Sequence, residues 1–123
     1  MARVLVIDDD RLMALTVFSA LEDAGHTPVL ARGDSMGRIV FSDLEHCDYD
    51  LVLTDLNMPV VSGWQVADWV GRHRPGTPVV AYSGALAAPR TEDAFEAFAA
   101  VMTKTEDLDK IAEVVDQVLR QPR

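Results

Sequence analysis

Residues 4–10 read VLVIDDD, four apolar residues followed by three consecutive aspartates. A continuous run of β-branched and apolar residues is typical of a parallel strand that is buried on both faces. Carboxylates directly after such a run favour the start of a helix, because the helix dipole stabilises negative charge there. The stretch therefore predicts a buried strand, a turn and a helix.

This unit recurs along the chain. Short apolar runs predict further strands at residues 29–31, 51–54, 78–82 and 101–103. Helices are expected between Asp10 and Gly25, and at residues 35–44, 64–72, 91–98 and 108–119. The predicted fold is α/β: a (βα)5 chain with a doubly wound, parallel five-stranded sheet of flavodoxin-like order 2-1-3-4-5, in a three-layer sandwich.

Length and charge narrow the class of protein. A chain of 123 residues has the size of one domain, so residues 1–123 are predicted to be a single unit. Its net charge of −9 argues against nucleic-acid binding, because proteins that bind phosphate backbones carry basic faces. A signal peptide and a membrane span are not recognisable, so we expect a cytoplasmic protein. The histidines at positions 26, 46 and 73 are interpreted as surface residues without a metal role.

Reactive side chains stand where the predicted strands end. Asp8 and Asp9 follow the first strand, Asp55 the third, Ser83 the fourth and Lys104 the fifth. Ligands of doubly wound sheets bind outside the carboxyl ends of the strands, at the switch point of the winding. These five residues are therefore expected to converge on one small hollow.

The predicted cluster has the composition of a phosphoryl-transfer site. Three neighbouring carboxylates repel one another, and a hard divalent cation with oxygen ligands relieves that repulsion. Mg²⁺ suits such a site when a phosphate shares it. Asp55 is then a carboxylate nucleophile that forms an aspartyl-phosphate, while Lys104 and Ser83 contact phosphoryl oxygens.

The motifs together resemble those of the response regulator receiver domain, in a single-domain form. They comprise Asp8-Asp9 after the first strand, the stretch LTDLNMP at residues 53–59 with Gly63, and the strand-end residues Ser83 and Lys104. The resemblance covers the whole chain. It implies a phosphoacceptor switch of a two-component or phosphorelay system, which takes its phosphoryl group from a sensor histidine kinase or a histidine phosphotransfer protein. Such a domain catalyses only its own phosphorylation and dephosphorylation.

The resemblance also implies a role for each site residue. Asp55 is the phosphoacceptor and a metal ligand. Asp8 and Asp9 also hold the metal, and Asp9 is favoured over Asp8 as the direct ligand. Asn57 contributes its backbone carbonyl to the metal. Ser83 and Lys104 contact the phosphoryl group.

Two positions depart from the family pattern. Receivers usually carry a proline after the lysine, where this chain has Thr105, and often an aromatic residue three positions before it, where this chain has Val101. We therefore expect the usual output mechanism to be weakened or replaced.

The first predicted helix carries a second apolar set. Leu12, Leu15 and Phe18 point away from its core stripe, so they are expected to be exposed. Three exposed apolar residues together predict a docking patch, and receivers commonly meet the phosphodonor on this helix.

Because no DNA-binding or catalytic segment follows the last predicted helix, output is expected through contact with another protein.

Two other functions stay open at this level. One is a receiver-like interaction module that is not phosphorylated, which Thr105 and Val101 favour and the intact carboxylate set opposes. The other is a Mg²⁺ phosphohydrolase of the haloacid-dehalogenase type. That class requires Asp-x-Asp, and Asn57 stands two residues after Asp55.

Overall fold

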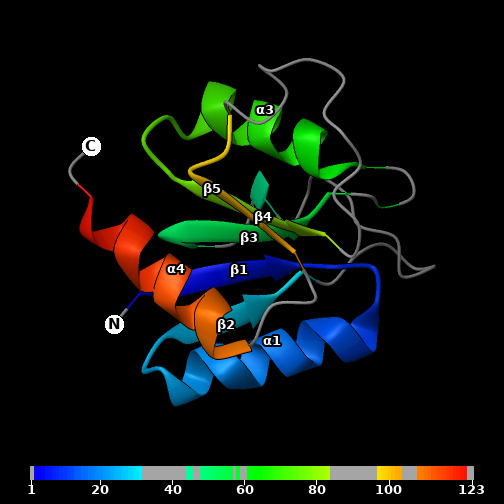
Figure 1. Ribbon diagram of the computed structural model, residues 1–123. Helices are drawn as coiled ribbons and strands as arrows, with labels where there is room; N and C mark the ends of the chain where they lie inside the picture. Colours follow the sequence, from blue (N-terminus) through cyan, green and yellow to red (C-terminus); the bar gives the residue numbers. More distant parts are fainter. Residues whose placement is uncertain are drawn as a thin grey trace.

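The computed structural model describes residues 2–31, 44–45, 48–56, 58, 61–83, 97–103 and 108–121. Its strands form a single parallel sheet of order β2-β1-β3-β4-β5, which confirms the predicted topology (Figure 1). The strands are β1 (Arg3–Ile7), β2 (Thr27–Leu30), β3 (Leu51–Asp55), β4 (Val79–Ser83) and β5 (Ala100–Thr103).

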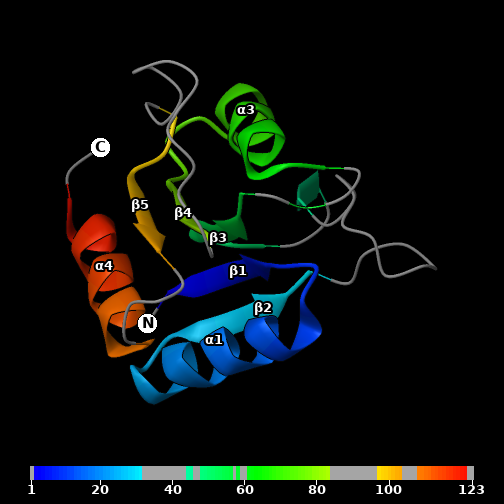
Figure 2. The same ribbon diagram turned by 45° about the vertical axis from the view of Figure 1, so that its right-hand side comes forward.

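Helices cover both faces of the sheet. Helices α1 (Arg11–Asp23) and α4 (Leu108–Arg120) lie on one face, and α3 (Gly63–His73) lies on the other (Figures 1 and 2). The predicted three-layer sandwich is therefore confirmed. Parallel strands need such crossover connections, and the helices bury the apolar side chains that project from each face.

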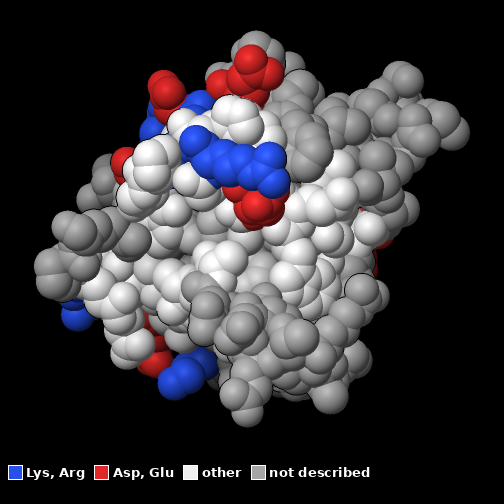
Figure 3. All heavy atoms as spheres, turned by 90° about the horizontal axis from the view of Figure 1, so that it is seen from above, with Lys and Arg blue, Asp and Glu red and all other residues white. Residues whose placement is uncertain are grey.

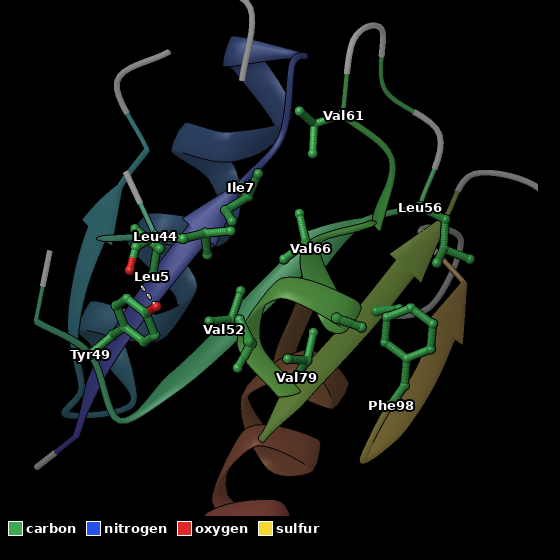
Figure 4. Close-up of a cluster of buried hydrophobic side chains, with 13 residues drawn as sticks. Leu5, Ile7, Leu44, Tyr49, Val52, Leu56, Val61, Val66, Val79 and Phe98 are labelled. Carbon is green, nitrogen blue, oxygen red and sulfur yellow. Dashed lines mark hydrogen bonds between the residues drawn. The ribbon is translucent and has the colours of Figure 1, made fainter. Parts of the chain in front are cut away.

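The alternation of side chains along each strand creates two cores. Leu5 and Val52 project towards α3, and Figure 4 shows them in the cluster that includes Val66 of that helix. Val4 and Leu53 project towards α1 and α4 and belong to the second cluster. Both clusters contain fully buried residues, so the central strands are fixed from both sides.

Two caps define the starts of the helices that come after β1 and β3. Asp10 has an extended backbone, and its side chain accepts a hydrogen bond from the Met13 N–H at 3.2 Å, which begins α1. Ser62 and Gln65 form a capping box that begins α3. Both helices therefore start at defined positions beside the strand ends.

Some predicted boundaries were wrong. The second strand begins at Thr27 rather than Val29, although it contains Pro28. Because β2 is an edge strand that pairs only with β1, the missing N–H of proline is tolerated there. Phe98 was predicted to end a helix, but it is not helical. It packs in the α3-side cluster just before β5. The predicted helices at residues 35–44 and 91–98 otherwise lie outside the described residues, except that Leu44 is helical.

Helix α3 carries an ion pair on its exposed side. Arg72 Nη2 lies 2.7 Å from Asp68 Oδ2, one helical turn away, and both side chains are exposed. Figure 3 shows that acidic and basic groups are interspersed among the described residues of this face. In the described part of this face, positive charge is not gathered into a patch that a nucleic acid requires.

Candidate functional site

The register of the three central strands brings the strand-end residues together. Ile7 of β1 pairs with Thr54 of β3, so the following residues, Asp8 and Asp55, emerge side by side. Asp55 in turn pairs with Tyr82 of β4. By alternation all three side chains lie on the α1/α4 face of their strands. The site is therefore set by backbone pairing along the carboxyl edge of the sheet.

Three carboxylates meet at this edge. One oxygen from each of Asp8, Asp9 and Asp55 lies within 4.8 Å of the other two. Asp8 and Asp55 are buried, at 7% and 6% exposure, whereas Asp9 is exposed. Closely spaced carboxylate oxygens of this kind are the ligands that Mg²⁺ prefers. The three carboxylates present thus fit a Mg²⁺ ion, which they would hold through one oxygen each.

Two donors hold the carboxylate of Asp8. Its Oδ1 accepts a hydrogen bond from the Asp10 N–H at 2.9 Å, and its Oδ2 accepts one from the Tyr82 hydroxyl at 2.8 Å. Burial, and then the negative charge of Asp8, raise the pKa of the Tyr82 hydroxyl far above its usual range. The phenol therefore stays protonated and acts as a hydrogen-bond donor to Asp8.

The backbone around Asp55 is held by hydrogen bonds from Thr54 and from the first residue of α3. The Thr54 hydroxyl donates to the Asp55 carbonyl at 2.8 Å, and the Gly63 N–H donates to the Leu56 carbonyl at 2.8 Å. A Cβ atom added to Gly63 would lie 2.5 Å from the Asp55 carbonyl oxygen. The start of α3 therefore packs directly on the strand end that carries Asp55.

The other predicted site residues divide between described and undescribed parts of the chain. Ser83 ends β4 next to Tyr82, is buried, and pairs with Thr103 of β5. Asn57 and Lys104 lie outside the described residues, as does Thr105. Val101 is half-buried and packs against the α3-side cluster.

The predicted docking patch is only partly exposed. Leu12 and Leu15 of α1 are 76% and 43% exposed, as expected. Phe18 is half-buried, so its predicted exposure was wrong. Helical spacing explains this, because Phe18 lies four residues after Ala14 and three before Leu21, both of which are buried. Leu15 also lines a surface pocket with Thr16, Ser19, Ala20, Asp23 and Asp109.

Two residues of structural importance were missed at the sequence level. Tyr82 was read only as part of a strand, although its pairing with Asp55 and its length place the phenol among the carboxylates. His26 was read as a surface residue, and that was wrong: its side chain is 9% exposed and its Nε2 lies 2.6 Å from Asp116 Oδ1 on α4. His73 is exposed as predicted, and His46 lies outside the described residues.

The fold and the site define an α/β domain with a doubly wound parallel sheet and an acidic site at the carboxyl edge of its central strands. A model of the response regulator receiver domain matches residues 4–116. The chain belongs to this family, which confirms the resemblance seen in its motifs. The family places the chain in two-component signalling.

Curated relatives are longer than this chain. Transcriptional regulatory protein TcrA of Mycobacterium tuberculosis is 35% identical over 78 residues, which are 63% of this chain and 30% of TcrA. Cell cycle transcriptional regulator CtrA of Caulobacter vibrioides is 35% identical over 86 residues, 67% of this chain and 34% of CtrA. The match therefore spans about a third of each of these relatives.

A solved structure supports the fold independently. Response regulator protein TrrA from Thermotoga maritima, in complex with Mg(2+)-BeF, matches with a TM-score of 0.81 at 22% identity. The match covers 96% of this chain and 99% of that chain.

Within the described part of this chain, we find no helix with the length and apolar character needed to cross a membrane.

Proposed function

We propose that Asp55 is the phosphoacceptor of this receiver domain, and that Asp8, Asp9 and Asp55 hold Mg²⁺ with the backbone carbonyl of Asn57. One observation carries the proposal: oxygens of the three carboxylates lie within 4.8 Å of one another at the carboxyl edge of β1 and β3. The relative TrrA was solved with Mg(2+)-BeF, which supports the same chemistry in this chain.

The transfer needs a nucleophile and stabilisation of charge. A carboxylate oxygen of Asp55 attacks the phosphorus of a phosphohistidine, so that a P–O bond forms while the P–N bond breaks and the imidazole leaves. When bound, Mg²⁺ supplies positive charge that offsets the phosphoryl oxygens. Ser83 donates its hydroxyl hydrogen bond to one oxygen, and Lys104 pairs with another. Water later hydrolyses the acyl phosphate, so the chain acts only on itself.

The proposal is tested by intact-mass measurement after incubation with acetyl phosphate, with and without Mg²⁺. We expect one phosphoryl adduct in the presence of Mg²⁺ and none in an Asp55→Asn variant. Asp50→Asn is the matched control, because Asp50 stands before the other end of β3, is exposed, and accepts a hydrogen bond from the Arg3 N–H. That variant is expected to be phosphorylated like the wild-type chain.

Other outcomes point to the competing functions. A folded wild-type chain without an adduct, also after incubation with phosphoramidate, would indicate an interaction module that is not phosphorylated. Repeated turnover of small phosphate esters would indicate a phosphohydrolase of the haloacid-dehalogenase type. An adduct that persists in Asp55→Asn would place the acceptor elsewhere.

The proposed phosphodonor is a histidine kinase or a histidine phosphotransfer protein that docks on α1. Leu12 and Leu15 supply exposed apolar surface there, and Leu15 continues into the pocket that Asp109 of α4 also lines. This surface lies on α1 itself, the helix that begins just after Asp8 and Asp9, so docking there would bring the donor histidine towards the site. We further propose that the domain is cytoplasmic and signals by protein contact, which its net charge of −9 favours over nucleic-acid binding.

A further inference from the structure

Tyr82 is a buried polar residue to which the proposed transfer gives no role. It is the largest fully buried side chain among the described residues, with 0% exposure. Its ring lies in the cluster between the sheet and helices α1 and α4. Its hydroxyl donates a 2.8 Å hydrogen bond to Asp8 Oδ2. A phenol in this position is more than core packing, because its polar end meets a carboxylate of the site.

The topology explains why this contact needs a long side chain. Tyr82 lies on β4 and Asp8 follows β1, and β3 with Asp55 runs between them. Two strand spacings separate β4 from β1, about 10 Å. Tyrosine spans most of that distance and carries a donor at its tip, whereas Val79, Val80 and Ala81 of the same strand do neither.

We propose that Tyr82 is a positioning residue for the metal site, which holds the Asp8 carboxylate in the orientation that Mg²⁺ binding requires. The inference rests on the proposed function and adds a residue to it. With the Asp10 N–H on Oδ1 and the Tyr82 hydroxyl on Oδ2, each oxygen of Asp8 has a donor. Outer residues that orient metal ligands in this way typically contribute tenfold or more to metal affinity.

The experiment compares Mg²⁺ binding by isothermal titration calorimetry in the wild-type chain, Tyr82→Phe and Tyr49→Phe. Phenylalanine keeps the ring and removes the hydroxyl. Tyr49 is the matched control, because it is also buried and its hydroxyl also donates to an internal oxygen, the Leu44 carbonyl at 2.6 Å (Figure 4). It precedes β3 and therefore lies at the opposite edge of the sheet from the carboxylates.

We expect the dissociation constant for Mg²⁺ to rise about tenfold in Tyr82→Phe and to stay within twofold of wild type in Tyr49→Phe. Thermal unfolding of all three proteins in EDTA measures stability without metal. Both variants lose a buried hydrogen bond, so both are expected to melt at a lower temperature than wild type. Only a loss of positioning also weakens Mg²⁺ binding. A role in packing alone lowers the melting temperature of Tyr82→Phe and leaves its Mg²⁺ affinity unchanged.

Failure of the inference differs from failure of the proposed function. If the wild-type chain binds Mg²⁺ and Tyr82→Phe binds it equally well, Tyr82 is not a positioning residue and the proposed site stands. Equal weakening in Tyr82→Phe and Tyr49→Phe also overturns the inference, because the effect is then general. A folded wild-type chain that does not bind Mg²⁺ overturns both.

Discussion

Gly63 shows how one residue determines the geometry of the strand end. Its N–H donates to the Leu56 carbonyl at 2.8 Å. An added Cβ atom would lie 2.5 Å from the Asp55 carbonyl oxygen and 2.8 Å from the Leu56 α-carbon. Both neighbours are backbone atoms, so they cannot move aside as a side chain does. Glycine is needed here for close approach.

Gly63→Ala is expected to lower the free energy of unfolding by about 1–3 kcal/mol, because the methyl group overpacks the contact between α3 and β3. Gly71→Ala is the control in the same helix, since a Cβ atom there has no atom within 4 Å. Its higher helix propensity is expected to stabilise by up to about 1 kcal/mol. Urea unfolding measures both. A Gly63→Ala variant as stable as wild type would contradict the close approach.

The single-residue predictions succeeded where the signal was local. Asp8 and Asp55 follow apolar runs directly, so their place at the sheet edge could be predicted from the sequence, and the structure brings them together. Tyr82 and Asp8 are 74 residues apart. Their contact depends on the strand register, which becomes fixed only when the sheet assembles.

At the scale of elements, a histidine joins the turn after α1 to the last helix. His26 Nε2 lies 2.6 Å from Asp116 Oδ1 of α4, and its Nδ1 is buried without a hydrogen-bond partner among the described residues. Among the described residues, Asp116 therefore provides the hydrogen bond of the His26 ring. Removal of the carboxylate leaves a buried polar ring without that partner, which is unfavourable.

Asp116→Ala is expected to lower the free energy of unfolding by about 1–2 kcal/mol in urea titrations. Asp68→Ala is the matched control, because it makes the same Asp→Ala change within a helix and so alters helix propensity similarly. Asp68 pairs with Arg72 on an exposed face, so its loss is expected to change stability by less than about 0.5 kcal/mol. In the double variant His26→Leu/Asp116→Ala, the loss is expected to be smaller than in Asp116→Ala, because the unpaired imidazole is gone. An equal loss from Asp116→Ala and Asp68→Ala would argue against this role for His26.

Element types were easier to predict from the sequence than element ends. The apolar runs predicted every strand of the sheet, because strands buried on both faces need continuous apolar sequence. The start of β2 was missed since Pro28 reads as a breaker in isolation, and only its edge position makes it acceptable. His26 was misjudged for a similar reason, as its partner lies 90 residues away.

At the scale of the whole molecule, the winding of the chain creates the site. Strands β1 and β3 are adjacent in the sheet but are separated in sequence by α1 and β2. Because all strands are parallel, their carboxyl ends share one edge (Figure 1). Asp8, which follows β1, and Asp55, which ends β3, meet at that edge. This convergence followed from the predicted strand order. The exposure of the α1 surface could be predicted only in part. Phe18 lies beside the buried stripe of the helix and is half-buried.

The partner surface leads to a prediction at this largest scale. Leu12→Gln/Leu15→Gln is expected to slow phosphoryl transfer about tenfold when the donor is a histidine kinase that phosphorylates the wild-type chain. The reason is that docking no longer buries these two exposed apolar side chains. Phosphorylation by acetyl phosphate is the internal control and is expected to stay unchanged, since this small donor needs no docking surface. Both side chains are exposed, so the fold should tolerate the change. Rates from both donors are measured as the growth of the phosphorylated species by mass spectrometry. Unchanged transfer from the kinase would remove Leu12 and Leu15 from the docking surface, and equal slowing with both donors would indicate a disturbed site instead.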